Sequence, residues 1–268
     1  MGGRGSRFKD LSIEQEKEKY WTDYGNADQD LETEIQNGLT KNLKDSNIIV
    51  CGSLKNLDNA VVETNLKQIK DLTHEFSRIV SSNLDDECIK IRSFKMNRIR
   101  IATGTKSPEY EILALFAPLK KQICFNERSI KDLGSLKSLV KHSQEVGHSV
   151  QIDEGKEGVY VITHEYGHFL ENCIIEKHIQ QDVRSWAKYK TDISEMIKMR
   201  KSEAESIRTK IKQIATEKYK ASEEQLKPSD YGDKSPFEWF AEVFAETKLH
   251  TTDKPLVKAM KEYLKGGF

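Results

Sequence analysis

The side chains best suited to chemistry in this chain stand together in one short segment, His164-Glu165-Tyr166-Gly167-His168. If the segment is helical, residues i and i+4 lie about 40° apart around the axis, so both imidazoles can reach one metal ion. Glu165 then lies beside that ion, where its carboxylate can take a proton from a water molecule that the metal activates. The spacing therefore predicts a zinc-dependent hydrolytic site, with His164 and His168 as ligands and Glu165 as the general base.

Apolar residues at helical spacing surround this motif and predict a buried helix over residues 158–177. They are Val159, Ile162, Phe169, Leu170, Cys173 and Ile174. Two histidines and a glutamate inside a buried helix need partners, and one metal ion can serve all of them. The alternative interpretation is a helix that carries two polar histidines by coincidence, which is rare in a 268-residue chain with seven histidines.

A catalytic zinc site needs a third protein ligand, and the residues close after the motif do not provide one. One common zinc-site spacing would place a glycine and a third histidine where the chain has Glu171 and Ile174. A glutamate 19 or 20 residues after the second histidine is also excluded, because those positions hold Ala187 and Lys188. His178 follows on the same or a continuing helix, from which we expect it to point away.

A second apolar helix, far downstream, carries two carboxylates at positions i and i+4, Glu238 and Glu242. Its other residues include Phe237, Phe240, Val243 and Phe244. Such a helix belongs in the core, where a carboxylate must be paired or bind metal. We propose Glu238 as the zinc ligand and Glu242 as a support that holds a histidine ring by its free N–H. The alternative is that Glu238 only completes a capping box with Ser235, and Glu242 is then the ligand.

Together, the motif at 164–168 and the segment from Tyr231 to Phe244 resemble the gluzincin metallopeptidases of the anthrax lethal factor type. The resemblance covers residues 157–178 and 229–247. It implies that His164, His168 and Glu238 bind one zinc ion and that Glu165 is the general base. It also implies that Tyr231, seven residues before Glu238, stabilises the oxyanion, and that Glu242 supports the ligands. Similar zincin-like domains occur in phage minor head and mobile-element proteins, and the glycine-rich start of the chain is similar to those.

The chain also departs from this family. The segment between the two halves of the site is long, and Asn172 stands where the family has an acidic residue. Asn172 could still accept a histidine N–H through its amide oxygen, as a weaker support than a carboxylate. The alternative is a polar residue at the edge of a buried helix.

Strand and helix patterns predict an α+β domain, and the resemblance implies a small mixed sheet ahead of the motif. We expect strands at 47–52, 88–94, 98–103, 111–116 and 122–126, and helices at 59–82, 131–145, 182–225 and 253–265. The polar segment 1–45 is expected to be a flexible or helical arm. Residues 46–268 would form the zincin-like domain, with 182–225 as a charged helical insertion. By this resemblance, an edge strand would bind an extended peptide by β-addition, and 112–116 is our choice.

Composition limits the partners. Lysine plus arginine balance aspartate plus glutamate at 43 each, so net charge gives no argument for nucleic acid or an anionic membrane. The basic stretch 198–220 is better explained as a solvated helix packed along one stripe than as a nucleic-acid surface. We therefore expect neither nucleic acid nor a membrane as a partner, and the resemblance implies a protein or peptide substrate.

The four cysteines, Cys51, Cys88, Cys124 and Cys173, form no C-x-x-C pair and are expected to be free, buried thiols in a reducing compartment. No signal peptide or membrane-spanning run is visible, which favours a cytoplasmic or virion-associated protein. Two rival interpretations remain: a structural or assembly protein of a phage particle that keeps zinc as a staple without hydrolysis, and a nucleic-acid or partner-binding module that works through the basic helix.

Overall fold

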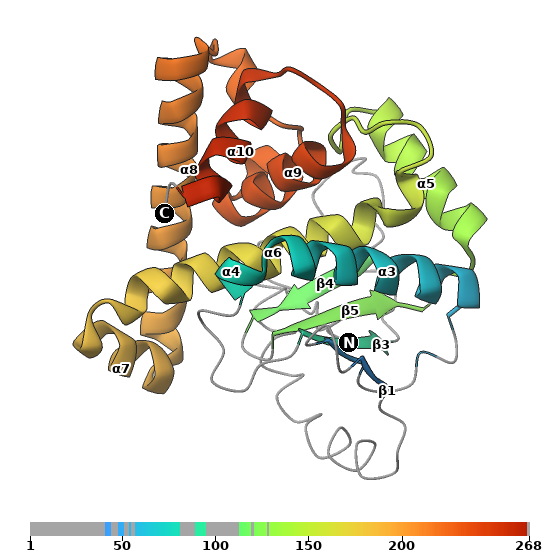
Figure 1. Cartoon of the computed structure of the whole chain (residues 1–268), viewed down its shortest axis with the longest axis horizontal. Helices are drawn as coiled ribbons and strands as arrows, with labels where there is room; N and C mark the ends of the chain where they lie inside the picture. The colour runs from blue at the N-terminus through green and yellow to red at the C-terminus, as the bar shows by residue number, and fades with distance from the viewer. Residues whose placement is uncertain are drawn as a thin grey trace, which may run out of the picture.

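The computed structural model of this chain (Figure 1) describes residues 41–43, 48–50, 54, 57–80, 89–94, 113–118, 121–127 and 129–266. The predicted strand at 98–103 lies outside these residues, as does nearly all of the predicted arm at 1–45. In the described part, helices predominate and one small mixed sheet accompanies them. The predicted α+β class is confirmed at this level.

The described sheet has five strands in the order β1-β2-β3-β5-β4. Their bounds are β1 (Lys41–Leu43), β2 (Ile48–Val50), β3 (Ile89–Phe94), β4 (Ala114–Ala117) and β5 (Gln122–Asn126). β2, β3 and β5 pair in parallel, whereas β1 and β4 are antiparallel to their neighbours. β1 was not predicted, and it falls inside the segment that we expected to be an arm. β4 is the last strand at one end of the described sheet, in agreement with the choice of 112–116 as an edge.

The helices follow the predicted segments closely. They are α3 (Asn59–Glu75), α4 (Ser77–Val80), α5 (Leu133–Glu145), α6 (Glu157–Gln180), α7 (Val183–Thr191), α8 (Ile193–Tyr219), α9 (Pro236–Leu249) and α10 (Pro255–Gly266), with the short 3-10 helices η4 (Glu224–Leu226) and η5 (Gly232–Lys234).

The segment predicted as helical at 182–225 forms two helices, α7 and α8, each begun by an aspartate, and α8 ends at Tyr219. The Asp182 side chain accepts from the amides of Arg184 and Ser185 at the start of α7, and Asp192 caps α8 through the amides of Ser194 and Glu195. One buried stripe runs along α8, in agreement with the packing along one stripe expected for 198–220. Its buried positions are Met196, Arg200, Ala204, Ile207, Ile211 and Ala215.

Helix α6 is the centre of the fold. It lies between the sheet and the group formed by α8, α9 and α10 (Figure 1). α3 and α5 also pack against it, so that most of its residues are buried on every side. The cysteines whose side chains are described, Cys124 on β5 and Cys173 on α6, are buried, as predicted. No helix in the described ranges is both long and apolar enough to cross a lipid bilayer.

Helices α6 and α9 approach each other closely at Gly167. A Cβ atom at this position would lie 3.0 Å from the Cα of Ala241 and 3.2 Å from Cδ1 of Phe244. The missing side chain therefore lets the backbones of the two helices come together, three residues after His164 and one before His168. This approach brings the histidines of α6 and the carboxylates of α9 within reach of one another.

Gly167→Ala should lower the free energy of unfolding by about 1–2 kcal/mol, because overpacking against the α9 backbone outweighs the better helix propensity of alanine. Gly158→Ala in the same helix is the matched control. A Cβ there would meet the movable side-chain ends of Leu133 and Lys137, so little loss is expected. Urea denaturation of both variants measures the difference. Equal stability of the two would contradict the close approach.

Candidate metal centre

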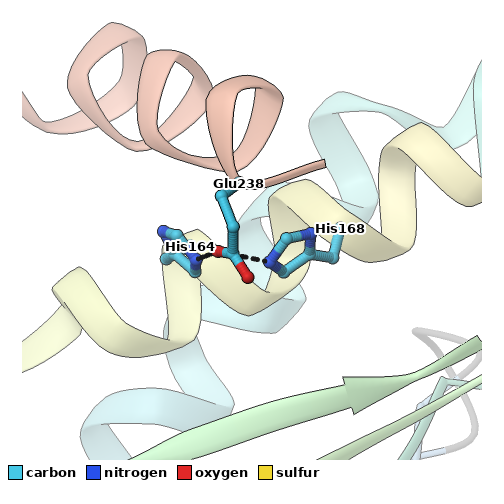
Figure 2. A group of neighbouring side chains, drawn as sticks. All are labelled: His164, His168 and Glu238. Atoms are coloured by element: carbon cyan, nitrogen blue, oxygen red, sulfur yellow. Dashed lines mark hydrogen bonds and ion pairs between the residues drawn. The ribbon is translucent and has the colours of Figure 1, made fainter. Parts of the chain in front are cut away.

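Three side chains from α6 and α9 converge on one point. Nε2 of His164 lies 3.1 Å from Oε2 of Glu238, and Nε2 of His168 lies 3.3 Å from the same oxygen. Figure 2 shows the two rings on either side of the Glu238 carboxylate. One potential ligand atom of each residue lies within 4.8 Å of those of the other two. Among the described residues, this is the one group of three histidine, cysteine or acidic side chains close enough to hold a metal ion. The structure thus brings together the three predicted ligands.

These distances fit a zinc ion. Tetrahedral zinc with bonds of about 2.0–2.1 Å separates neighbouring ligand atoms by about 3.3 Å. The donor set, two imidazole nitrogens and one carboxylate oxygen, is a common one for catalytic zinc. The side chains of His164, His168 and Glu238 are 8%, 13% and 8% exposed, so the group is largely buried but keeps some contact with solvent.

The start of α9 explains how Glu238 is aimed. The Ser235 hydroxyl accepts a hydrogen bond from the Glu238 amide at 3.1 Å, and Pro236 takes the first helical position. This is one half of the capping box that we weighed as an alternative role. The Glu238 carboxylate, however, lies against the two histidines, so the cap orients the residue while its side chain faces the metal position.

Glu242, one turn later on α9, is fully buried and supports the site from behind. Its Oε1 lies 2.9 Å from Nδ1 of His164 and also accepts a hydrogen bond from the hydroxyl of Tyr160. Its Oε2 accepts from the amide of Val150 at 2.9 Å and from the Ser229 hydroxyl at 2.8 Å. The structure therefore places Glu242 where the predicted support of a histidine ring requires it.

The partners of Glu242 decide its charge. Burial raises the pKa of this carboxyl group, but hydrogen bonds from His164, Tyr160 and Ser229 and the His164 charge outweigh burial and lower it. Burial and the Glu242 charge raise the pKa of Tyr160 well above 10.0, which keeps its hydroxyl protonated as a donor. Glu242 is therefore ionised at neutral pH.

Sequence reasoning missed three of these partners. Tyr160 stands four residues before His164 and so shares its helix face, a signal that could have found it. Ser229 lies two residues before Tyr231, but no motif singled it out. The Val150 amide belongs to a loop after α5. A main-chain donor of this kind cannot be recognised from the pattern of side chains in a sequence.

His164 lies between two carboxylates. Burial lowers the pKa of its imidazole, but hydrogen bonds and charges from Glu238 and Glu242 outweigh burial and raise the pKa to about 10. The ring therefore carries a proton at neutral pH in the arrangement seen here. A metal ligand must be deprotonated, so a zinc ion must displace this proton.

Glu165 and Tyr231, the two predicted catalytic residues, both lie near this group. The Glu165 side chain is buried, and its Oε2 has no hydrogen-bond partner in the described part of the chain. Tyr231 is half-buried at the start of η5, with its ring centroid 5.9 Å from that of His164. Each of the two thus lies next to a residue of the candidate metal group, Glu165 by its neighbouring position on α6 and Tyr231 by the fold.

Asn172 makes no hydrogen bond to the histidines or to Glu242 among the described residues. It is fully buried on α6, and neither its Oδ1 nor its Nδ2 has a hydrogen-bond partner among the described residues. Its support of a histidine remains a prediction. The sequence also gave no role to Glu171, whose pKa is raised well above 4.5 by burial and by the Glu238 charge, while the Arg200 charge opposes this.

Comparison with protein-family models, with curated protein sequences and with solved structures found no match to this chain. Function must therefore be argued from the site itself.

Glu242→Gln should weaken zinc binding about 10- to 100-fold, because an amide cannot carry the charge that orients the His164 ring. Glu246→Gln is the matched control. Glu246 is also buried, one turn further along α9, but pairs with Lys254 at 2.5 Å and with His250 at 3.4 Å, away from the ligands. Both changes should cost stability. A chelator competition titration that gave both variants the same zinc affinity would contradict the support role.

Zinc affinity should rise about tenfold per pH unit from pH 7 to 9, because zinc must displace the proton that Glu238 and Glu242 hold on His164. The direction follows from the pKa of about 10, since raising the pH toward that value removes the competing proton. Competition titrations with a chromophoric chelator, corrected for the protonation of the chelator, measure the slope. A flat profile over this range would show that His164 is already neutral.

Proposed function

We propose that this chain is a zinc-dependent metalloendopeptidase that hydrolyses peptide bonds of a protein or peptide substrate. One observation carries the proposal: His164 and His168 of α6 and Glu238 of α9 converge at zinc-ligand spacing. The positions of Glu165 and Tyr231 beside these ligands add to it. The described residues offer three protein ligands, which would leave a fourth position for water or substrate, as in catalytic zinc sites.

The residues have separate roles in the proposed reaction. A bound zinc ion would polarise the scissile carbonyl and lower the pKa of its water toward about 7. Glu165 accepts a proton from the attacking water and passes it to the leaving amine. Tyr231 donates its phenolic hydrogen to the oxyanion that forms as the carbonyl is attacked. Glu242 keeps the His164 ring in place throughout.

The proposed substrate is an extended segment of polypeptide. β4 stands at one end of the described sheet and packs against α6, the helix that carries the two histidines. An edge strand can add a peptide strand through its main-chain hydrogen-bonding groups, which would lay the peptide along the side of α6.

A zinc-stapled structural protein without hydrolytic activity is the second candidate. The low exposure of the ligands, at most 13% of a side chain, favours it, because structural zinc sites are closed to solvent. The unpartnered Oε2 of Glu165, the residue next to His164 on α6, favours the enzyme, because a buried carboxylate oxygen without a donor among the described residues is costly unless it has a task. The two candidates differ in turnover and not in metal content.

Glu165→Gln should lower kcat about 10²- to 10⁴-fold while keeping about one zinc per chain, because the amide cannot accept the proton of the attacking water. Turnover is measured with a library of internally quenched peptides. Zinc is measured by plasma mass spectrometry on protein purified without added metal or a nickel-binding tag. Glu157→Gln, in the first turn of α6 and away from the ligands, is the control and should cleave like the wild type.

The outcomes separate the candidates. Zinc with cleavage that Glu165→Gln removes supports the peptidase. Zinc with no cleavage of any peptide leaves the structural staple. A chain that takes up no zinc, even when zinc is offered to the folded protein, excludes both.

A further inference from the structure

The segment between α5 and α6 joins the two halves of the site. The carbonyl of Gly147 accepts from the amide of Asp230 at 3.3 Å, and the carbonyl of His148 accepts from the amide of Tyr231 at 3.1 Å. Two residues further on, the Val150 amide donates to Glu242. Residues 147–150 therefore fix the main chain of the Tyr231 loop and the residue that supports His164 at the same time.

The side chain of His148 adds a second contact to Tyr231. The two ring centroids are 5.0 Å apart with the planes tilted by 45°, and the Tyr231 ring is in turn 5.9 Å from that of His164. The three rings thus follow one another from the half-buried His148 to the buried metal ligand. Burial and the Lys234 charge lower the pKa of His148 below 6.5, so at neutral pH an uncharged ring faces Tyr231.

We propose that His148 is a positioning residue for Tyr231, which it holds toward the metal ligands by ring packing. Tyr231 needs such a support because it stands in a loop at the start of η5, and only Gly232 of that turn is buried, whereas Asp233 and Lys234 are exposed. A phenol that stabilises an oxyanion must be placed within hydrogen-bond distance before the charge forms, and a displacement of about 1 Å can cost about 10²-fold in rate. The inference rests on the proposed function for its catalytic consequence, but not for the contact itself.

Three single variants of the full-length, zinc-loaded protein test the ring contact. His148→Ala removes the ring and should lower kcat about 10- to 100-fold on the quenched-peptide library, with KM changed less than about threefold. His148→Phe restores a ring without its nitrogens and should return kcat to within about threefold of the wild type. His142→Ala, an exposed histidine on α5, is the control and should have no effect.

A double-mutant cycle tests whether His148 acts through Tyr231. Tyr231→Phe removes the donor, so adding His148→Ala to it should lower kcat little further. A loss that is as large in the Tyr231→Phe background as in the wild type would overturn the inference. Full activity of His148→Ala would also overturn the inference, as would a failure of His148→Phe to restore activity.

A readout that needs no turnover separates this inference from the peptidase proposal. In protein with labelled tyrosine, the NMR signal of Tyr231 is assigned by its loss in Tyr231→Phe. His148→Ala should move this signal toward that of an exposed tyrosine, and His142→Ala should leave it in place. An unmoved signal in His148→Ala overturns the inference. A wild type that cleaves nothing, with the signal moved as expected, overturns the peptidase proposal alone.

Discussion

The buried carboxylate of Glu242 is the interaction on which the rest of the site depends. An isolated charge in a protein core is very costly, and it persists only when its oxygens are surrounded by donors. Here the donors come from three different places: the loop after α5 through Val150, the loop before η5 through Ser229, and α6 through Tyr160 and His164. Solvating one carboxylate therefore requires these segments to meet at one point on α9.

The crossing of α6 and α9 makes that meeting possible. Both helices are apolar along most of their length, and their packing holds the ligands as part of the core. Gly167 allows the backbones to approach at the level of the histidines, and the Ser235 cap begins α9 where Glu238 faces them. The ligands are thus carried by rigid, buried elements, whereas Tyr231 is carried by a loop and depends on its neighbours for its position.

The charged segment between the two halves of the site is more than a solvated insertion. Its long helix α8 buries a stripe against the core, and Arg200 in this stripe is 6% exposed. The Arg200 guanidinium lies 5.3 Å from the ring of Phe237, the residue before Glu238, and its charge acts on the buried Glu171 of α6. The insertion therefore brings a buried charge to the residues next to Glu238 and to α6.

Much of this arrangement could be predicted because it is local. The helical position of His164, Glu165 and His168, the buried course of α6, the extent of β5 and the cap at Ser235 follow from residue spacing over one or two turns or strands. The class of fold followed from the order of these segments. The sequence pattern missed β1 and the division at Asp192, where pairing and a single side-chain cap overrode the longer pattern.

By itself, then, the sequence determined which residues could bind a metal and on which helix face they lie, because i and i+4 spacing is a property of the helix alone. It left two carboxylates open for one ligand position. Only the tertiary structure decided between their places, putting Glu238 against both Nε2 atoms and Glu242 against Nδ1 of His164. It also decided that Val150, Ser229 and His148 belong to the site. Their contacts join segments that are far apart in the chain. These segments meet at the buried charge of Glu242, and no local sequence pattern predicts where such a charge is buried.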